Sequence, residues 1–119
     1  MPAILVMDDE PSLLATLALI LEAKGYEVET ALSVERAREL IETRRFAALL
    51  ADLNMPGDGA TAIAVMRQRQ PETPIVLITG YVGPQDVPAE VRTMVNAILF
   101  KPIEIPSLLR QLAAWTQSA

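Results

Sequence analysis

The stretch AILVMDDEP, residues 3 to 11, leads five apolar side chains directly into three consecutive acids. A short, uninterrupted apolar run of this kind is typical of a strand that is buried on both faces of a parallel sheet. Pro11 is a favourable first-turn residue, so we expect a helix to begin immediately after the acids. The stretch therefore predicts a βα unit with three carboxylates at the end of its strand.

This alternation of a short strand pattern and a longer helical pattern occurs five times. The expected strands span residues 3–7, 27–30, 47–52, 74–78 and 97–100. Three of these runs are nearly continuous in apolar residues, as in strands covered on both faces. The sequence therefore predicts an α/β fold, a doubly wound sheet of five parallel strands with five helices.

Helical spacing of apolar residues locates the helices between and after these strands. Their expected starts are Pro11, the residue after Ser33, about Gly59, about Ala89 and about Pro106. The first is expected to end at Gly25 and the third at Pro71. The fourth, over about 89–95, is expected to be irregular because Pro84 and Pro88 interrupt its segment.

The composition excludes several classes of function. A chain of 119 residues suffices for one hydrophobic core, so residues 1–119 are expected to form one domain. It contains no apolar run near the roughly 20 residues of a membrane span and no secretory signal pattern, which predicts a soluble, cytoplasmic protein. Without histidine or cysteine, the chain has no Ser-His-Asp or Cys-His nucleophile system and no ordinary zinc site. A net charge of −5 disfavours direct binding of nucleic acid.

Polar residues follow four of the five expected strands. Asp8 and Asp9 follow the first, Asp52 ends the third, Thr79 follows the fourth and Lys101 follows the fifth. Carboxyl ends of parallel strands meet at one edge of the sheet, where sites form, so we expect these side chains to lie close together. Lys101 is one of only two lysines beside eight arginines, which suggests that its compact ammonium was selected for its chemistry.

Each of these features also has an ordinary structural explanation. Acids after a strand are commonly solvated loop residues, and 54–57, with Asn, Pro and Gly, is a typical turn. Thr79 alone is compatible with a helix cap and Lys101 alone with a solvated cation. Their joint occurrence at one edge of the sheet favours a site.

Clustered carboxylates predict a metal. They repel one another, and a hard divalent cation with oxygen ligands relieves that repulsion. Mg2+ fits best because it usually takes one or two carboxylates together with water and phosphate oxygens. A carboxylate beside such an ion can attack phosphorus and form an acyl phosphate, while the metal and a lysine balance the charge of the phosphoryl oxygens.

Four motifs in this order resemble the receiver domain of bacterial two-component response regulators, over essentially the whole chain. They are DD at 8–9, D-x-N-M-P-G at 52–57, T-G at 79–80 and K-P at 101–102. The resemblance implies a flavodoxin-like sheet with strand order 2-1-3-4-5. It also implies that Asp52 is the phosphoacceptor, with Asp9 a direct Mg2+ ligand and Asp8 a ligand through water. The main-chain carbonyl of Asn54 completes the set of Mg2+ ligands that the protein is expected to supply.

The resemblance also assigns the other site residues and the partners. Thr79 is expected to hydrogen-bond one phosphoryl oxygen and Lys101 to pair with another, with a cis peptide bond before Pro102. Gly80 leaves room for the phosphoryl group. Because the chain has no histidine, the phosphoryl group must come from a partner's phosphohistidine, on a sensor histidine kinase or a histidine phosphotransfer domain, or from a small donor such as acetyl phosphate. The expected docking surface is 11–15 together with 102–105.

Three features depart from the family pattern. Ile98 occupies the position of the usual switching aromatic, so that Tyr81 or Phe100 would have to serve. The loop after Asp52 reads MPGDG, one residue shorter than usual, which is expected to bring Asp58 and Gly59 closer to the site. Third, the fourth helical segment carries prolines. In this it resembles receivers that read T-G-Y after the fourth strand, some of which have a poorly formed fourth helix.

The resulting prediction is a phosphorylatable signalling switch, and not an enzyme with a substrate of its own. Phosphorylation is expected to bias the surface of the fourth strand, fourth helix and fifth strand between two conformations. A binding-only pseudo-receiver is one alternative. A second is a phosphohydrolase of the haloacid-dehalogenase type, although the first strand lacks that family's D-x-D-x-T pattern and the chain has no room for a cap domain. A free-standing regulator, a receiver of a hybrid kinase and a receiver of a larger regulator all fit the sequence.

Overall fold

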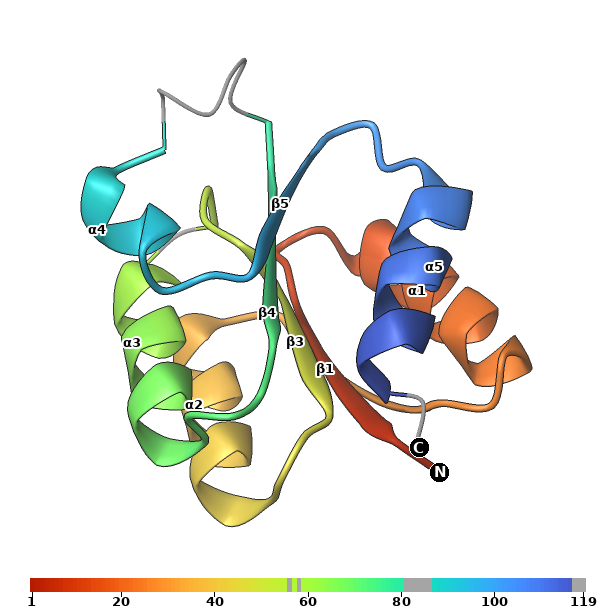
Figure 1. Ribbon diagram of the computed structural model, residues 1–119, viewed down its shortest axis with the longest axis horizontal. Coiled ribbons are helices and arrows are strands. Elements are labelled where there is room, and N and C mark those ends of the chain that lie inside the picture. Colours follow the sequence, from red (N-terminus) through yellow and green to blue (C-terminus); the bar gives the residue numbers. More distant parts are fainter. Residues whose placement is uncertain (56, 58, 81–86, 117–119) are drawn as a thin grey trace.

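A five-stranded parallel sheet lies between two layers of helices in the computed structural model, which describes residues 1–55, 57, 59–80 and 87–116 (Figure 1). In chain order the elements are β1 (Ala3–Met7), α1 (Pro11–Ala23), β2 (Glu27–Ala31), α2 (Val34–Thr43), β3 (Ala48–Asp52), α3 (Gly59–Arg69), β4 (Ile75–Thr79), α4 (Ala89–Arg92), β5 (Ala97–Phe100) and α5 (Ile105–Thr116). The strand order is β2-β1-β3-β4-β5, and every pairing is parallel. The predicted fold class is therefore confirmed.

Alternating side chains of the central strands build two cores, one on each face of the sheet. In β1, Leu5 and Met7 belong to the core beneath α2 and α3, whereas Ile4 and Val6 belong to the core beneath α1 and α5. All residues of β3 and β4 are buried. Strands covered on both faces need apolar side chains at every position, which explains their uninterrupted apolar runs.

The helices bury the stripes that their spacing predicts. On α1, Leu14, Leu17 and Leu21 are buried, and the helix ends ahead of Gly25, whose φ of +94° favours glycine. Ser33 caps α2 by accepting a hydrogen bond from the backbone N–H of Arg36 at 3.1 Å. No helix among the described residues is both long and apolar enough to cross a membrane.

The boundaries of three expected strands are corrected. β2 ends one residue later than expected, at Ala31. β4 spans Ile75–Thr79 rather than 74–78, so that Thr79 is the last residue of the strand and pairs with Phe100. Pro74 lacks an N–H and gives the ladder only its carbonyl, which accepts a hydrogen bond from the N–H of Leu49 at 3.0 Å. β3 begins one residue later than expected, at Ala48.

α4 is shorter than the expected 89–95 and ends at Arg92. The N–H of Met94 donates to the carbonyl of Val91 at 2.9 Å, which tightens the chain into a three-residue turn. The carbonyl of Met94 accepts hydrogen bonds from the side chain of Arg67 on α3 and is directed away from a helical partner. The expected irregularity is observed as a helix that ends at Arg92, whereas Pro84 lies outside the described residues.

Candidate metal centre

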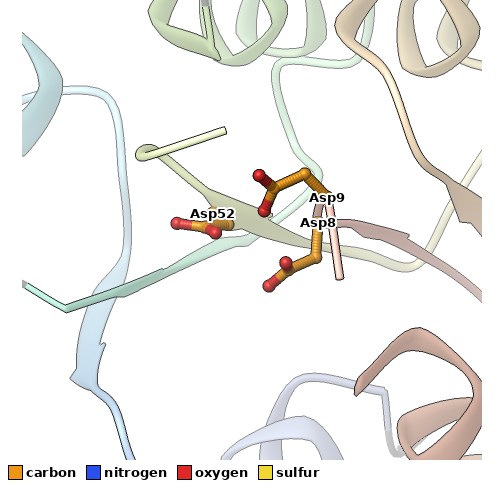
Figure 2. Close-up of side chains that lie close together, drawn as sticks. All are labelled: Asp8, Asp9 and Asp52. Carbon is orange, nitrogen blue, oxygen red and sulfur yellow. The ribbon is translucent and has the colours of Figure 1, made fainter. Parts of the chain in front are cut away.

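Three aspartates meet where two neighbouring strands end. Asp8 and Asp9 directly follow β1 and Asp52 ends β3, and the register pairs Met7 with Ala51, so that the acids emerge side by side (Figure 2). One carboxylate oxygen of each residue lies within 4.8 Å of those of the other two. Asp8 and Asp52 are each only 3% exposed, whereas Asp9 is open to solvent. The structure brings together the acids that the strand ends predicted.

Local hydrogen bonds orient the two buried carboxylates. Oδ1 of Asp8 accepts from the backbone N–H of Glu10 at 3.0 Å, and Oδ1 of Asp52 accepts from the backbone N–H of Asn54 at 2.9 Å. Both are turns in which an aspartate bonds to the amide two residues further on. Each buried aspartate therefore has one oxygen fixed by the main chain and presents the other to the centre of the site.

Lys101 lies among these acids. Its Nζ is 3.2 Å from Oδ2 of Asp8, 3.2 Å from Oδ2 of Asp52 and 3.3 Å from Oε1 of Glu10. Strong bonds between an ammonium and a carboxylate are shorter, about 2.7–2.9 Å. The ammonium thus shares its charge among three acceptors without a short bond to any of them, and a new anion can compete for it.

The acids also keep Lys101 charged. Partial burial lowers its pKa, but the hydrogen bond and charge of Asp52, together with those of Asp8, outweigh that effect and raise the pKa above its usual value. The ammonium therefore remains protonated throughout the neutral range. The peptide bond between Lys101 and Pro102 is cis, as the resemblance implied.

Thr79 occupies the third strand end of the site and is fully buried. Its Oγ1 accepts a long hydrogen bond of 3.4 Å from Nδ2 of Asn54, and its carbonyl accepts a bond of 2.8 Å from the N–H of Lys101. Gly80 follows it, and a Cβ added at Gly80 would lie 3.7 Å from Nδ2 of Asn54, which is ordinary van der Waals contact. Thr79, Asn54 and Lys101 therefore form one side of the site.

Two contacts were missed at the sequence level. Glu10 is a third carboxylate partner of Lys101, and the side-chain amide of Asn54 contacts Thr79. The position of Glu10 beside the two aspartates was a usable signal, because it belongs to the same run of acids. The spacing of residues does not indicate the contact of the Asn54 amide.

The departures from the family pattern have partial answers in the structure. Ile98 packs against the core beneath α2 and α3, and Phe100 is half-buried beside Thr79 in the β4–β5 register. Gly57 has a φ of +98°, and a Cβ there would lie 3.3 Å from Cγ2 of Val34, so that this turn needs glycine. The expectations for Asp58 and Tyr81 concern positions outside the described residues.

The donor set fits a hard divalent cation. Every candidate ligand is an oxygen. Within the described ranges the ammonium of Lys101 contacts the carboxylates of Asp8, Glu10 and Asp52, and the carboxylate of Asp9 lies beside those of Asp8 and Asp52. Such an excess of negative charge is relieved by an ion such as Mg2+, which prefers carboxylate, carbonyl and water oxygens. The geometry thus agrees with the metal that the sequence predicted.

Residues 4–113 match the family of response regulator receiver domains. The chain belongs to this family. Receiver domains are the phosphoacceptor signalling switches of two-component systems, and they interact with histidine kinases or phosphotransfer partners and with downstream effectors.

Known relatives agree with this membership. The chain is 31% identical over 117 residues to the photosynthetic apparatus regulatory protein RegA of Cereibacter sphaeroides, and the match covers 98% of this chain and 64% of RegA. The chain therefore spans less than two thirds of that relative.

Solved structures agree as well. Response regulator TrrA of Thermotoga maritima, in complex with Mg2+-BeF, has a TM-score of 0.85 at 26% identity, covering 97% of this chain and 99% of TrrA. A response regulator of Burkholderia pseudomallei, with a phosphorylated aspartic acid, a calcium ion and citrate, has a TM-score of 0.85 at 29% identity, covering 94% of this chain and 66% of that one. Similar chains thus carry a divalent cation, and one carries an aspartyl phosphate.

Proposed function

We propose that this receiver domain takes a phosphoryl group onto Asp52 from a phosphohistidine of a sensor histidine kinase or a histidine phosphotransfer domain. The proposal rests on one observation. A carboxylate oxygen of the buried Asp52 lies within 4.8 Å of those of Asp8 and Asp9, close enough for one metal ion to bind all three, and Lys101 contacts Asp52 at 3.2 Å. A nucleophile, a place for a divalent cation and a positive charge for phosphoryl oxygens are thereby in one place. A binding-only pseudo-receiver is not supported by the comparisons.

The proposed Mg2+ ligands are Asp9, Asp52 and the main-chain carbonyl of Asn54, with Asp8 acting through a water molecule. When bound, the ion neutralises the charge that the carboxylates and the phosphoryl oxygens bring together. The main-chain bonds to Asp8 and Asp52 support this assignment because they orient both carboxylates before a cation arrives. The exposed Asp9 is the acid that solvent and a cation reach first.

In the proposed reaction, an oxygen of Asp52 attacks the phosphorus of the donor. The P–N bond breaks, its electron pair returns to the imidazole, and an acyl phosphate forms on Asp52. Lys101, whose bond to Oδ2 is long, transfers its contact to a phosphoryl oxygen, and the hydroxyl of Thr79 donates to another. These side chains stabilise charge that develops on the phosphoryl group, which is the main protein contribution in phosphoryl transfer.

A surface beside the site suits the donor domain. α1 carries no charged residue from Pro11 to Leu21, and a hollow of about 260 Å3 separates it from the segment after β5. Leu13, Leu17 and Ile103 line this hollow, and Lys101 lies at its border. An apolar surface next to the phosphoacceptor supports docking of the donor against 11–15 and 102–105.

The output is proposed to pass through the surface of β4, α4 and β5. Lys101 and Thr79 stand at the ends of β5 and β4, so a change in their hydrogen bonds reaches that surface directly. The domain thus acts as a switch that passes its state to a protein partner, and it turns over no substrate of its own.

Phosphate uptake tests the proposal. The protein incubated with acetyl phosphate and Mg2+ is expected to gain the mass of one phosphoryl group, and Asp52→Asn is expected to gain none. Glu42→Gln, which removes an exposed acid on α2 away from the site, is the matched control and is expected to behave as the wild type. Undiminished incorporation by Asp52→Asn would refute the assignment.

A further inference from the structure

The guanidinium of Arg67, on α3, is saturated by neutral acceptors far from the acidic site. Its Nε and Nη2 donate to the carbonyl of Met94 at 3.1 and 2.8 Å, and Nη2 also donates to Oδ1 of Asn96 at 2.8 Å. Nη1 donates to the carbonyls of Pro71 at 2.8 Å and Thr73 at 3.1 Å. An arginine offers five N–H donors, and each has an acceptor here. Arg67 thus joins α3, the α3–β4 loop and the segment that leads into β5.

Asn96 passes this connection to the sheet. Its Oδ1 accepts a second hydrogen bond, from the N–H of Ile75 at 2.9 Å, and its own N–H donates to the carbonyl of Ile75 at 2.8 Å. Ile75 is the first residue of β4, and β5 starts immediately after Asn96. The beginning of β5 is therefore fixed to both β4 and α3 by one pair of side chains.

β5 depends on this attachment more than the other strands do. It is an edge strand of four residues, paired only with β4, and all four residues are half-buried. The helix before it, α4, also has only four residues. Lys101 follows β5, roughly 16 Å from Asn96 along an extended chain, and its N–H is bonded to Thr79. The strand is therefore attached at both ends, through Asn96 before it and through the N–H of Lys101 after it.

We propose that Arg67 is a positioning residue for Lys101: by anchoring the start of β5 it holds the lysine ammonium between Asp8 and Asp52. Arg67 acts through the strand and touches none of the site residues. The proposal depends on the role assigned to Lys101 under the proposed function, but its structural part can be measured on the unphosphorylated protein.

The first test is hydrogen exchange of the Lys101 amide, followed by NMR. Arg67→Met is expected to lower the protection of this amide about tenfold, because β5 loses the anchor at its start. Arg69→Met is the matched control, since Arg69 lies on the same helix and its contact with Glu42 is a surface pair 3.8 Å apart. Unchanged protection in Arg67→Met would overturn the proposal.

The second test is a double-mutant cycle on the rate of phosphate uptake from acetyl phosphate with Mg2+. Arg67→Met is expected to slow uptake roughly three- to tenfold when Lys101 is present, and to have almost no effect in the Lys101→Ala background. An equal slowing in both backgrounds would show that Arg67 acts only on general stability and would overturn the proposal. A wild-type protein that takes up no phosphate would refute the proposed function instead, while the exchange test would still decide the role of Arg67.

Substitutions at Asn96 cover the case in which Arg67→Met does not fold. Asn96→Asp keeps an acceptor for Arg67 and for the N–H of Ile75, so the protection of the Lys101 amide is expected to stay within about twofold of the wild type. Asn96→Leu removes the acceptor and is expected to lower the protection about tenfold. Equal protection in these two variants would contradict the proposal.

Discussion

The sheet is held together by opposite kinds of interaction at its carboxyl edge, where the strands end, and at its amino edge, where the strands begin. At the carboxyl edge, charges meet: Lys101 lies 3.2–3.3 Å from three carboxylates, and no contact is short. At the amino edge, neutral amides and carbonyls meet around Gln70 and Arg67, with most bonds between 2.8 and 3.1 Å. The first edge is able to accept an ion and a phosphoryl group, whereas the second is already complete. The site that can change its contacts is therefore separate from the hydrogen-bond network that holds the domain together.

The side chain of Gln70 lies at the centre of the hydrogen bonds at the amino edge. Only 4% of its surface is exposed, and Oε1 accepts from the N–H of Phe46 at 2.9 Å. Its Nε2 donates to the carbonyls of Ile41 at 3.1 Å and Arg44 at 2.8 Å, and Thr73 donates to Oε1 at 3.3 Å. One side chain thus joins the α2–β3 connection to the end of α3.

The largest expected effect on stability comes from breaking this network. Gln70→Ala leaves buried main-chain groups without partners, each costing about 1–3 kcal/mol, so we expect the free energy of unfolding to fall by about 3 kcal/mol or more. Urea denaturation measures the change, and phosphate uptake well below the melting temperature is expected to stay normal. A variant of normal stability would show that the hydrogen bonds of Gln70 do not stabilise the domain.

A comparable effect on chemistry is expected at the other edge. Lys101→Ala keeps the fold and the metal ligands, but phosphate uptake is expected to slow about a hundredfold, as when one donor to a developing charge is removed. Rates of incorporation from acetyl phosphate measure this, and signalling output is expected to be lost. If the variant takes up phosphate and signals normally, the role given to the lysine is wrong.

A smaller effect is expected from the cation. Mg2+ at about ten times its Kd should stabilise the folded protein by roughly 1.4 kcal/mol, because it binds the assembled acids and not the unfolded chain. Thermal melts with and without Mg2+ measure this shift. Asp9→Asn is expected to abolish most of it, whereas Glu39→Gln, a surface acid on α2, should leave it unchanged. An undiminished shift in Asp9→Asn would place the ion elsewhere.

The smallest effect is expected from the ion pairs near the amino edge. Arg44 contacts Glu27 at 2.8 Å and Glu29 at 2.9 Å, but all three side chains are 30–49% exposed. Exposed pairs contribute about 0–1 kcal/mol, so Arg44→Ala is expected to lower the free energy of unfolding by less than about 1 kcal/mol. A loss as large as that of Gln70→Ala would show that charge, and not the neutral network, holds this edge.

The sequence predicted the carboxyl edge far better than the amino edge, for a physical reason. Asp8, Asp52 and Lys101 follow apolar runs whose direction is set by the parallel sheet, so strand ends alone bring them together. Arg67 lies on α3 and Gln70 directly follows that helix, and nothing in their spacing indicates which distant carbonyls they bind. The end of α4 at Arg92 was also missed, because the sequence does not indicate that the N–H of Met94 bonds to the carbonyl of Val91.

The identity of the residue that carries the phosphoryl group is the most direct test of the role proposed for Asp52. After incubation with acetyl phosphate and Mg2+, reduction with borohydride converts an aspartyl phosphate to homoserine, which tandem mass spectrometry locates in the chain. Homoserine is expected at position 52, and only when Mg2+ is present. Homoserine at Asp8, Asp9 or any other position, or none in a protein that has gained phosphate, would contradict that role.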